Sequence, residues 1–299
     1  MDEQFRIIEI ALEMRRDVEQ LGSKPKFWFT YKTQNWLFKE ARQNTGEDWS
    51  EKLASEIALL LGIKTHQAEL AIFNGRRGCA VKSFIESHQT FLVHGNELLG
   101  GVFDDYDKNK ERGQADHNMD RIVKVIESIF SEKEVLLTTA SNMIGYLVFD
   151  ALVGNTDRHH QNWGVIVEHR LEEGGKPIFI PQLAPSFDHA SSLGRELTDE
   201  ARNRFITEGR VERYISKGKG GIFENADAKH ALSPMALFQL LLTRYPKLTV
   251  PWKNRVAEVS EVDFRKLVAR IPPDRISEQG RAFVLEFLSK SRRMIIEAQ

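Results

Sequence analysis

The stretch from residue 149 to residue 167 constrains the fold of this 299-residue chain more than any other segment. Before Gly154, apolar residues recur at helical spacing, whereas Trp163, Val165 and Val167 stand at every second position, as residues on one face of a strand do. Gly154 and the Asn after it form a typical helix stop. The sequence therefore predicts a short polar loop that connects a helix to a strand, and loops of this kind usually carry function.

Asp157 and Asn162 lie in this loop, five residues apart. The same spacing occurs in the kinase catalytic loop, where the Asp takes the proton of the substrate hydroxyl and the Asn binds Mg²⁺. A kinase also needs a later carboxylate for the metal, often directly after a Phe. Asp188 fits this role, following an expected strand over 176–180 and a turn over 181–185.

The residues Gly154-Asn155-x-Asp157-x-His159-x-x-Asn162, followed by Ala184-Pro185-Ser186-Phe187-Asp188, resemble the C-terminal kinase domain of the HipA-type serine/threonine kinases. Asp157-Arg158-His159-x-x-Asn162 is also similar to the catalytic loop of phosphoinositide lipid kinases. Both resemblances imply phosphoryl transfer. The HipA resemblance implies an α+β, bilobal, protein-kinase-like fold with a small strand-rich N-lobe (1–85) and a mainly helical C-lobe (86–299).

The resemblance also implies roles for the residues of the loop. Asp157 is expected to be the catalytic base, and Asn162 and Asp188 the Mg²⁺ ligands. His159 is expected to support the loop rather than to perform chemistry. ATP and Mg²⁺ are the implied cofactors.

The HipA nucleotide loop has a Gly-x-Gln-x-Lys character, which this chain matches at Gly22 and Lys26, with Ser23 between them. Lys39, at the end of a predicted strand, is the expected contact of the α/β-phosphates. Glu51, on a predicted helix over 49–61, is expected to pair with Lys39, as in kinases. By resemblance, residues around Val81 and Ser83 form the hinge that holds adenine.

Local patterns predict the remaining elements. A stripe over 5–18 predicts a leading helix, and hairpins are expected over 27–39 and 70–84. Helices are expected over 122–130 and 134–153. Further amphipathic helices are expected over 238–242, 256–267 and 283–296.

Composition restricts the class of protein. With 41% hydrophobic and 28% charged residues the chain has material for a globular core. A formal charge of −1 argues against wholesale binding to nucleic acid or anionic membrane, although the stretch 201–221 carries a local charge of +4. Cys79 is the single cysteine, so we expect a reducing, cytoplasmic setting. No signal peptide and no membrane span are expected.

The expected substrate is a protein with a Ser or Thr acceptor. If the toxin role of the family extends to this chain, a small DNA-binding antitoxin is the expected partner. The chain begins just before the nucleotide loop, so it is expected to lack the extra N-terminal subdomain of long HipA proteins.

Three other functions fit the residues. The acceptor alcohol can belong to a lipid or small molecule, because the loop does not specify it. Asp157, His159, His160, Asp188 and His189 are ligand types that suit a metal-dependent hydrolase. A nucleotide-binding pseudokinase is the last alternative, and the intact set of Lys, Glu, Asp, Asn and Asp argues against it.

Overall fold

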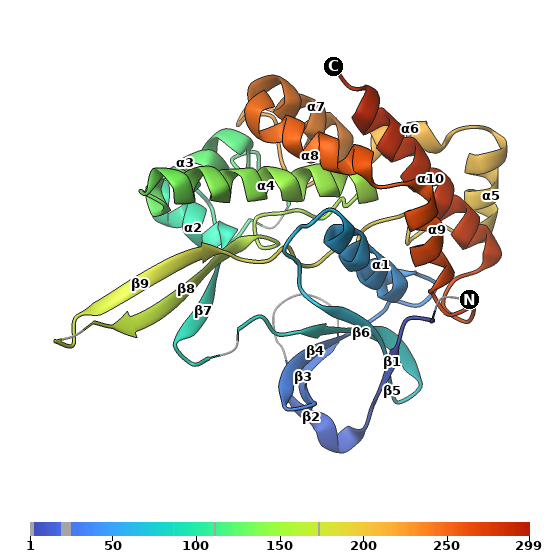
Figure 1. Ribbon diagram of the computed structural model, residues 1–299, viewed down its shortest axis with the longest axis horizontal. Coiled ribbons are helices and arrows are strands. Elements are labelled where there is room, and N and C mark those ends of the chain that lie inside the picture. Colours follow the sequence, from blue (N-terminus) through green and yellow to red (C-terminus); the bar gives the residue numbers. More distant parts are fainter. Residues whose placement is uncertain (1–2, 19–24, 86, 111, 173) are drawn as a thin grey trace.

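The computed structural model describes residues 3–18, 25–85, 87–110, 112–172 and 174–299. Six strands near the N-terminus form one sheet in the order β1-β5-β6-β4-β3-β2. They are β1 (Ile7–Ile10), β2 (Arg15–Val18), β3 (Lys26–Tyr31), β4 (Gln34–Glu40), β5 (Ala68–Phe73) and β6 (Arg76–Lys82). Helix α1 (Glu47–Leu60) packs on β5 and β6, between this sheet and the helical part of the molecule (Figure 1).

The predicted helix over 5–18 is wrong. The segment forms β1, the short 3-10 helix η1 (Leu12–Met14) and β2. Strand β1 runs parallel to β5, with Ile7 opposite Leu70. Ile8 and Ile10 are buried and alternate with exposed residues, whereas Leu12, which belongs to the helical stripe, is 65% exposed. The sheet partner therefore overrides a pattern that is compatible with both structures.

The two predicted hairpins are confirmed. In the first, Phe27 lies opposite Phe38 and Tyr31 opposite Gln34, so the loop consists of Lys32 and Thr33. Both loop residues have positive φ, as two-residue hairpin turns of the favoured type require. The second hairpin joins β5 to β6 through Asn74-Gly75, which also have positive φ.

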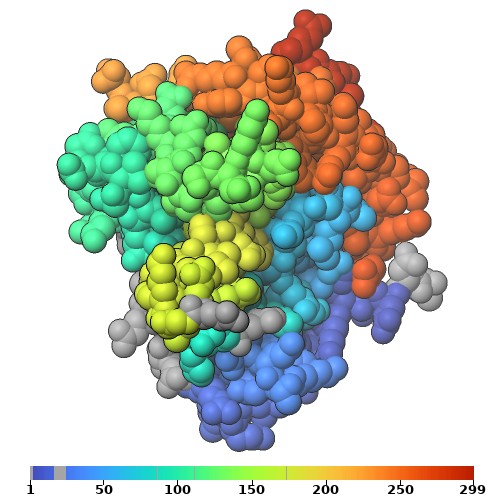
Figure 2. All heavy atoms as spheres, turned by 60° about the vertical axis from the view of Figure 1, so that its left-hand side comes forward, coloured from blue at the N-terminus to red at the C-terminus, as the bar shows by residue number. Residues whose placement is uncertain are grey.

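A second, three-stranded sheet has the order β7-β8-β9, formed by β7 (Thr90–His94), β8 (Gly164–Leu171) and β9 (Pro177–Leu183). Pro181 was expected in a turn but lies inside β9, opposite Val167. Strand β9 is an edge strand, where a missing N–H is tolerated. In Figure 2 this region, in yellow, lies on the surface between the blue N-terminal strands and the green helices.

The helical part is built around α4 (Lys133–Val153), which packs against α7 (Pro234–Arg244), α8 (Pro246–Glu258) and α10 (Glu278–Glu297). By length and composition α4 resembles a membrane span, but 61% of the apolar window is buried inside the fold. Its C-cap, Gly154, has φ 66°, as the predicted helix stop requires. The other helices are α2 (Gly95–Val102), α3 (Met119–Ile129), α5 (Asp199–Thr207), α6 (Val211–Lys217) and α9 (Glu261–Ala269).

One predicted helix is divided. The segment 256–267 was expected to be continuous, but α8 ends at Glu258 and α9 begins at Glu261. Ser260 is the N-cap of α9: its hydroxyl accepts from the Asp263 N–H, and the Asp263 carboxylate accepts from the Ser260 N–H. This capping box satisfies the free N–H groups of a new helix start.

A buried ion pair joins α1 to the segment that precedes α10. Asp48 and Arg275 both have fully buried side chains, and Arg275 Nη1 lies 2.9 Å from Asp48 Oδ2. We expect Asp48→Ala to lower the free energy of unfolding by about 3–5 kcal/mol, because it removes the buried carboxylate that pairs with a buried guanidinium. Urea denaturation followed by circular dichroism measures this change.

The matched control is Arg265→Ala, which breaks an exposed pair with Glu261 on α9. This change is expected to cost about 0.5 kcal/mol or less. Equal effects of the two substitutions would contradict the assignment of Asp48 as a structural anchor.

Candidate active site

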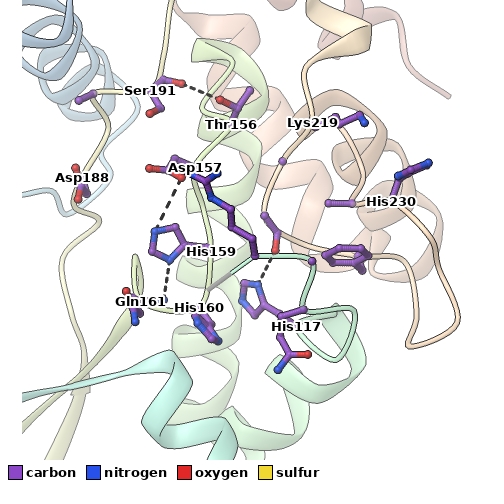
Figure 3. A pocket seen from close by; sticks show the side chains of 18 of the residues that line it. His117, Thr156, Asp157, His159, His160, Gln161, Asp188, Ser191, Lys219 and His230 are labelled. Carbon is purple, nitrogen blue, oxygen red and sulfur yellow. Dashed lines mark hydrogen bonds and ion pairs between the residues drawn. The ribbon is translucent and has the colours of Figure 1, made fainter. Parts of the chain in front are cut away.

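A pocket of about 1030 Å³ is lined both by strands of the six-stranded sheet and by loops of the helical part. Its lining residues come from β3 and β4, from the loops after α4 and β9, and from the segments 112–117 and 219–231. Lys26, Lys39, Asp157, His159 and Asp188, all predicted site residues, are among them. Figure 3 labels Asp157, His159 and Asp188. The fold therefore brings together residues that lie more than a hundred positions apart in the sequence.

Not every predicted site residue lies in the lining. Gly22 and Ser23 lie outside the described residues. Val81 is buried in β6, and the Ser83 N–H donates to Asn35 O at 2.9 Å. Neither belongs to the described lining, so the adenine hinge stays a prediction.

The loop after α4 is held by a buried ion pair. Asp150, in the last turn of α4, accepts hydrogen bonds from Arg158 Nε at 2.7 Å and from Arg158 Nη2 at 2.8 Å. Asn155 Nδ2 donates to the same carboxylate at 2.9 Å. Burial alone lowers the pKa of Arg158, but the Asp150 charge outweighs it and the pKa lies above the usual value. The guanidinium thus remains charged and keeps its geometry.

Arg158 also links this loop to the segment that contains Asp188. Its Nη1 donates to Asn162 O at 2.7 Å and its Nη2 donates to Ser186 Oγ at 3.0 Å. The motif-based reasoning assigned Arg158 no role of its own. Two features of the sequence indicate the role of Arg158. It lies between the candidate site residues Asp157 and His159, and an acid, Asp150, stands eight positions before it.

Asn162 supports the backbone of Asp157. Asn162 is buried, and its Nδ2 donates to Asp157 O at 2.7 Å. Because the amide nitrogen is committed to this bond, the amide oxygen is the atom that remains for a metal. The Asp157 side chain is 52% exposed, and His159 Nε2 lies 3.9 Å from its Oδ1. Asp157 is thus accessible from the pocket while its backbone is held in place.

Asp188 has a strained backbone, with φ 60°. This left-handed conformation is uncommon for a residue other than Gly and tends to occur at functional sites. Its carboxylate accepts from Lys39 Nζ at 3.0 Å. Burial alone lowers the pKa of the Lys39 ammonium, but the charges of Asp188 and Glu51 outweigh it and raise the pKa above its usual value. Lys39 therefore remains a cation.

The predicted partner of Lys39 was Glu51, but among the described residues Lys39 pairs with Asp188, and the Glu51 carboxylate contacts His66 instead. Glu51 is fully buried, and its Oε1 lies 2.9 Å from His66 Nε2 and accepts from the His189 N–H at 2.9 Å. His66 takes the place expected for Lys39 because residues 64–66 are bridged to Ser186, beside the end of α1. No motif indicated His66.

The charge state of Glu51 follows from these neighbours. Burial alone raises the pKa of the carboxyl, but the hydrogen bond with His66 and the charge of Lys39 outweigh it and hold the pKa below its usual range. The anion therefore ties α1 to the residue directly after Asp188.

The ligands expected for a metal-dependent hydrolase do not come together. His160 Nδ1 makes a hydrogen bond of 2.7 Å with Tyr106 OH, and His189 Nε2 makes one of 2.8 Å with Ser186 Oγ. Within the described ranges, the side chains that are close enough to share a metal are those of Glu51, His66 and His189. This group contains neither Asp157 nor Asp188, so the expected hydrolase centre is not formed.

Comparisons with known proteins agree with this geometry. The chain is 30% identical, over 152 residues, to the serine/threonine-protein kinase CtkA of Helicobacter pylori (strain J99 / ATCC 700824). This alignment spans 50% of the chain and 42% of CtkA.

Two solved structures share the fold. The crystal structure of the Helicobacter pylori proinflammatory kinase CtkA superposes with a TM-score of 0.74 at 20% identity, over 98% of this chain and 96% of that one. HipA of Shewanella oneidensis MR-1, solved with HipB and operator DNA, has a TM-score of 0.59 at 12% identity, over 94% of this chain and 65% of that one. The predicted α+β kinase-like fold is confirmed.

A model of the HipA-like C-terminal domain matches residues 20–234. The match covers the catalytic loop, Asp188 and Lys39, and it confirms the resemblance that the motifs indicated. The chain belongs to the HipA-like C-terminal domain family.

Proposed function

We propose that the chain is an ATP- and Mg²⁺-dependent serine/threonine protein kinase of HipA type. The observation that carries the proposal is the convergence of Lys39, Asp157 and Asp188 on one pocket, with Lys39 Nζ 3.0 Å from Asp188 Oδ1. A base, a phosphate-binding cation and a carboxylate for the metal are the parts that phosphoryl transfer requires. Membership of the family and the likeness to CtkA support this activity.

The residues present fit Mg²⁺ and a nucleotide. Mg²⁺ prefers hard oxygen ligands, and the Asp188 carboxylate and the Asn162 amide oxygen supply them. When bound, Mg²⁺ neutralises charge on the transferred phosphoryl group. Lys26 lies opposite Lys39 in the β3–β4 pair, and both side chains line the pocket. In the proposed complex these two cations bind phosphate oxygens.

Asp157 is the residue that meets the acceptor. Its exposed carboxylate accepts the hydrogen bond of the acceptor hydroxyl and takes its proton as the phosphoryl group is transferred. The Asp157 N–H donates to Asn155 Oδ1 at 3.1 Å, and the Asp157 carbonyl accepts from Asn162. The backbone from which the carboxylate extends is therefore fixed. A base must be positioned in this way to act in the transition state.

We extend the proposal to a cytoplasmic protein substrate and to a small DNA-binding antitoxin as partner. The solved HipA structure contains HipB and operator DNA, which supports a toxin–antitoxin setting. Growth of cells that express the wild-type chain or Asp157→Asn tests the toxin role. Arrest by both proteins alike would show that phosphoryl transfer is not the cause.

We predict that Asp157→Asn reduces phosphoryl transfer by roughly 10²–10⁴-fold, because the base is lost. Half-exposure of the side chain predicts an unchanged melting temperature. Transfer of labelled γ-phosphate from ATP to protein substrate measures the first effect, and thermal unfolding the second. Retention of wild-type turnover would rule out Asp157 as the base.

We predict that Asp188→Asn weakens Mg²⁺-dependent nucleotide binding, since a neutral amide is a poorer ligand for a hard cation. Calorimetry with a non-hydrolysable ATP analogue, with and without Mg²⁺, measures the difference. Asp120→Asn, which changes an exposed carboxylate on α3, is the control and is expected to bind like wild type. An unchanged Mg²⁺ effect in Asp188→Asn would contradict the metal assignment.

A further inference from the structure

The pocket concentrates positive charge that the whole chain lacks. The formal charge of the chain is −1, yet among the described lining residues seven Lys and Arg side chains face only two carboxylates, Asp157 and Asp188. The cations are Lys26, Lys39, Arg42, Arg112, Arg195, Lys219 and Lys229. The excess therefore arises from how the chain folds and not from its composition.

Part of this charge is balanced within the protein. Lys39 pairs with Asp188, and both Arg42 and Arg195 pair with Glu47, at 3.1 and 2.8 Å. The other cations include three exposed side chains: Arg112, Lys219 and Lys229. In the part of the chain that the structure describes, none of these three has an acidic side chain within ion-pair distance.

The loop that carries Lys219 is seated directly on the catalytic loop. A Cβ on Gly221 would lie 2.6 Å from the His159 nitrogen, and one on Gly218 would lie 3.2 Å from Thr156 Cγ2. Only a backbone without side chains approaches this closely. Lys219 lies between these glycines, so its position is set by residues on either side of Asp157.

Hydrogen bonds fix this loop in place. Trp163 Nε1 donates to His117 Nε2 at 3.0 Å, so the other ring nitrogen, Nδ1, carries the proton and donates to Gly221 O at 2.8 Å. Gly220 N donates to Leu232 O at 2.8 Å. The backbone that carries Lys219 is therefore fixed before a ligand binds, which lowers the ordering cost of recognition.

The segment that contains Lys219 lies on the side of Asp157 where the nucleotide is not expected. In Figure 3, Lys219 and His230 lie on the opposite side of Asp157 from Asp188. The nucleotide phosphates of the proposed function belong with Asp188 and Lys39. The positive charge around Lys219 is therefore available to bind the substrate whose hydroxyl group is phosphorylated.

We propose that Arg112, Lys219 and Lys229 form a subsite for acidic residues that flank the Ser or Thr acceptor, so that the preferred substrate is an acidic peptide segment. The inference rests on the proposed kinase function. A peptide suits this surface better than a nucleic acid, because single-stranded nucleic acids are held by exposed aromatic side chains as well as cations. Among the described lining residues the only Phe, Tyr or Trp is Phe223, which is buried.

The test uses two fluorescein-labelled peptides with one central Ser, flanked by Asp and Glu in one and by Asn and Gln in the other. Fluorescence anisotropy without ATP gives the Kd of each, and steady-state phosphorylation gives kcat and KM. The variant is Lys219→Glu with Lys229→Glu. The control is Lys247→Glu with Lys266→Glu, which makes the same charge change at exposed positions on α8 and α9, outside the described lining.

We expect wild type to bind the acidic peptide roughly tenfold or more tightly than the amide peptide, about 1.4 kcal/mol, and the variant to lose this preference while the control keeps it. In the variant the KM for the acidic peptide rises, and kcat and the KM for ATP change little. The preference weakens as salt is raised from 0.05 to about 0.5 M, because the contacts are exposed charges. This salt series on wild type is an independent check should the variant fold poorly.

Equal affinity for the two peptides would overturn the subsite, even if both are phosphorylated and the kinase assignment stands. Tight binding of the acidic peptide without phosphate transfer would overturn the kinase assignment and leave an anion-binding subsite. A 12-nucleotide RNA that binds more tightly than the acidic peptide, and loses affinity in the same variant, would show that the ligand is a nucleic acid and would overturn the peptide proposal.

Discussion

Asp150 and Arg158 form a buried ion pair at the junction between α4 and the loop that carries Asp157, and the rest of the site depends on it. One guanidinium reaches the end of α4, the carbonyl of Asn162 and the hydroxyl of Ser186. Removing one partner of such a pair costs about 3–5 kcal/mol, so the loop has little freedom to take another shape. Asp157 can be half-exposed to the pocket and still keep its position, because the buried side chain of Arg158, the next residue, is held by Asp150.

The second constraint joins the two parts of the molecule. Glu51 accepts from the His189 N–H, and Ser50 Oγ donates to Ser192 O at 2.9 Å, so α1 is attached at two points to the segment after Asp188. Lys39, on β4, pairs with Asp188 itself. The position of α1 and the position of Asp188 are therefore coupled, although among the described residues Lys39 and Glu51 form no direct ion pair.

Features set by near neighbours in the sequence were predictable. The end of α4 at Gly154 and the Asn74-Gly75 turn are as expected, and the first hairpin is also present, although its turn is Lys32-Thr33 rather than the predicted 32–35. The prediction of a leading helix was wrong because β1 pairs with β5. The residues of β5 lie some sixty positions further along the chain, so the local pattern around β1 does not indicate the pairing. The partner of Glu51 was wrong for the same reason, since His66 is brought to it by the bridge between Thr65 and Ser186.

The net charge of the chain likewise does not show which charges the fold brings together at one site. A formal charge of −1 argues against wholesale binding to nucleic acid or anionic membrane, but it does not describe the charge of any one site on the surface. Here the cations of the pocket come from β3, β4 and four separate loops, while other acids pair outside the pocket, as Asp48 does with Arg275. A potential that steers a ligand is set by the charges within about a Debye length of the site, roughly 8 Å in the cell. The net charge of the whole chain also includes charges that lie beyond this distance and have little effect on a ligand at the site.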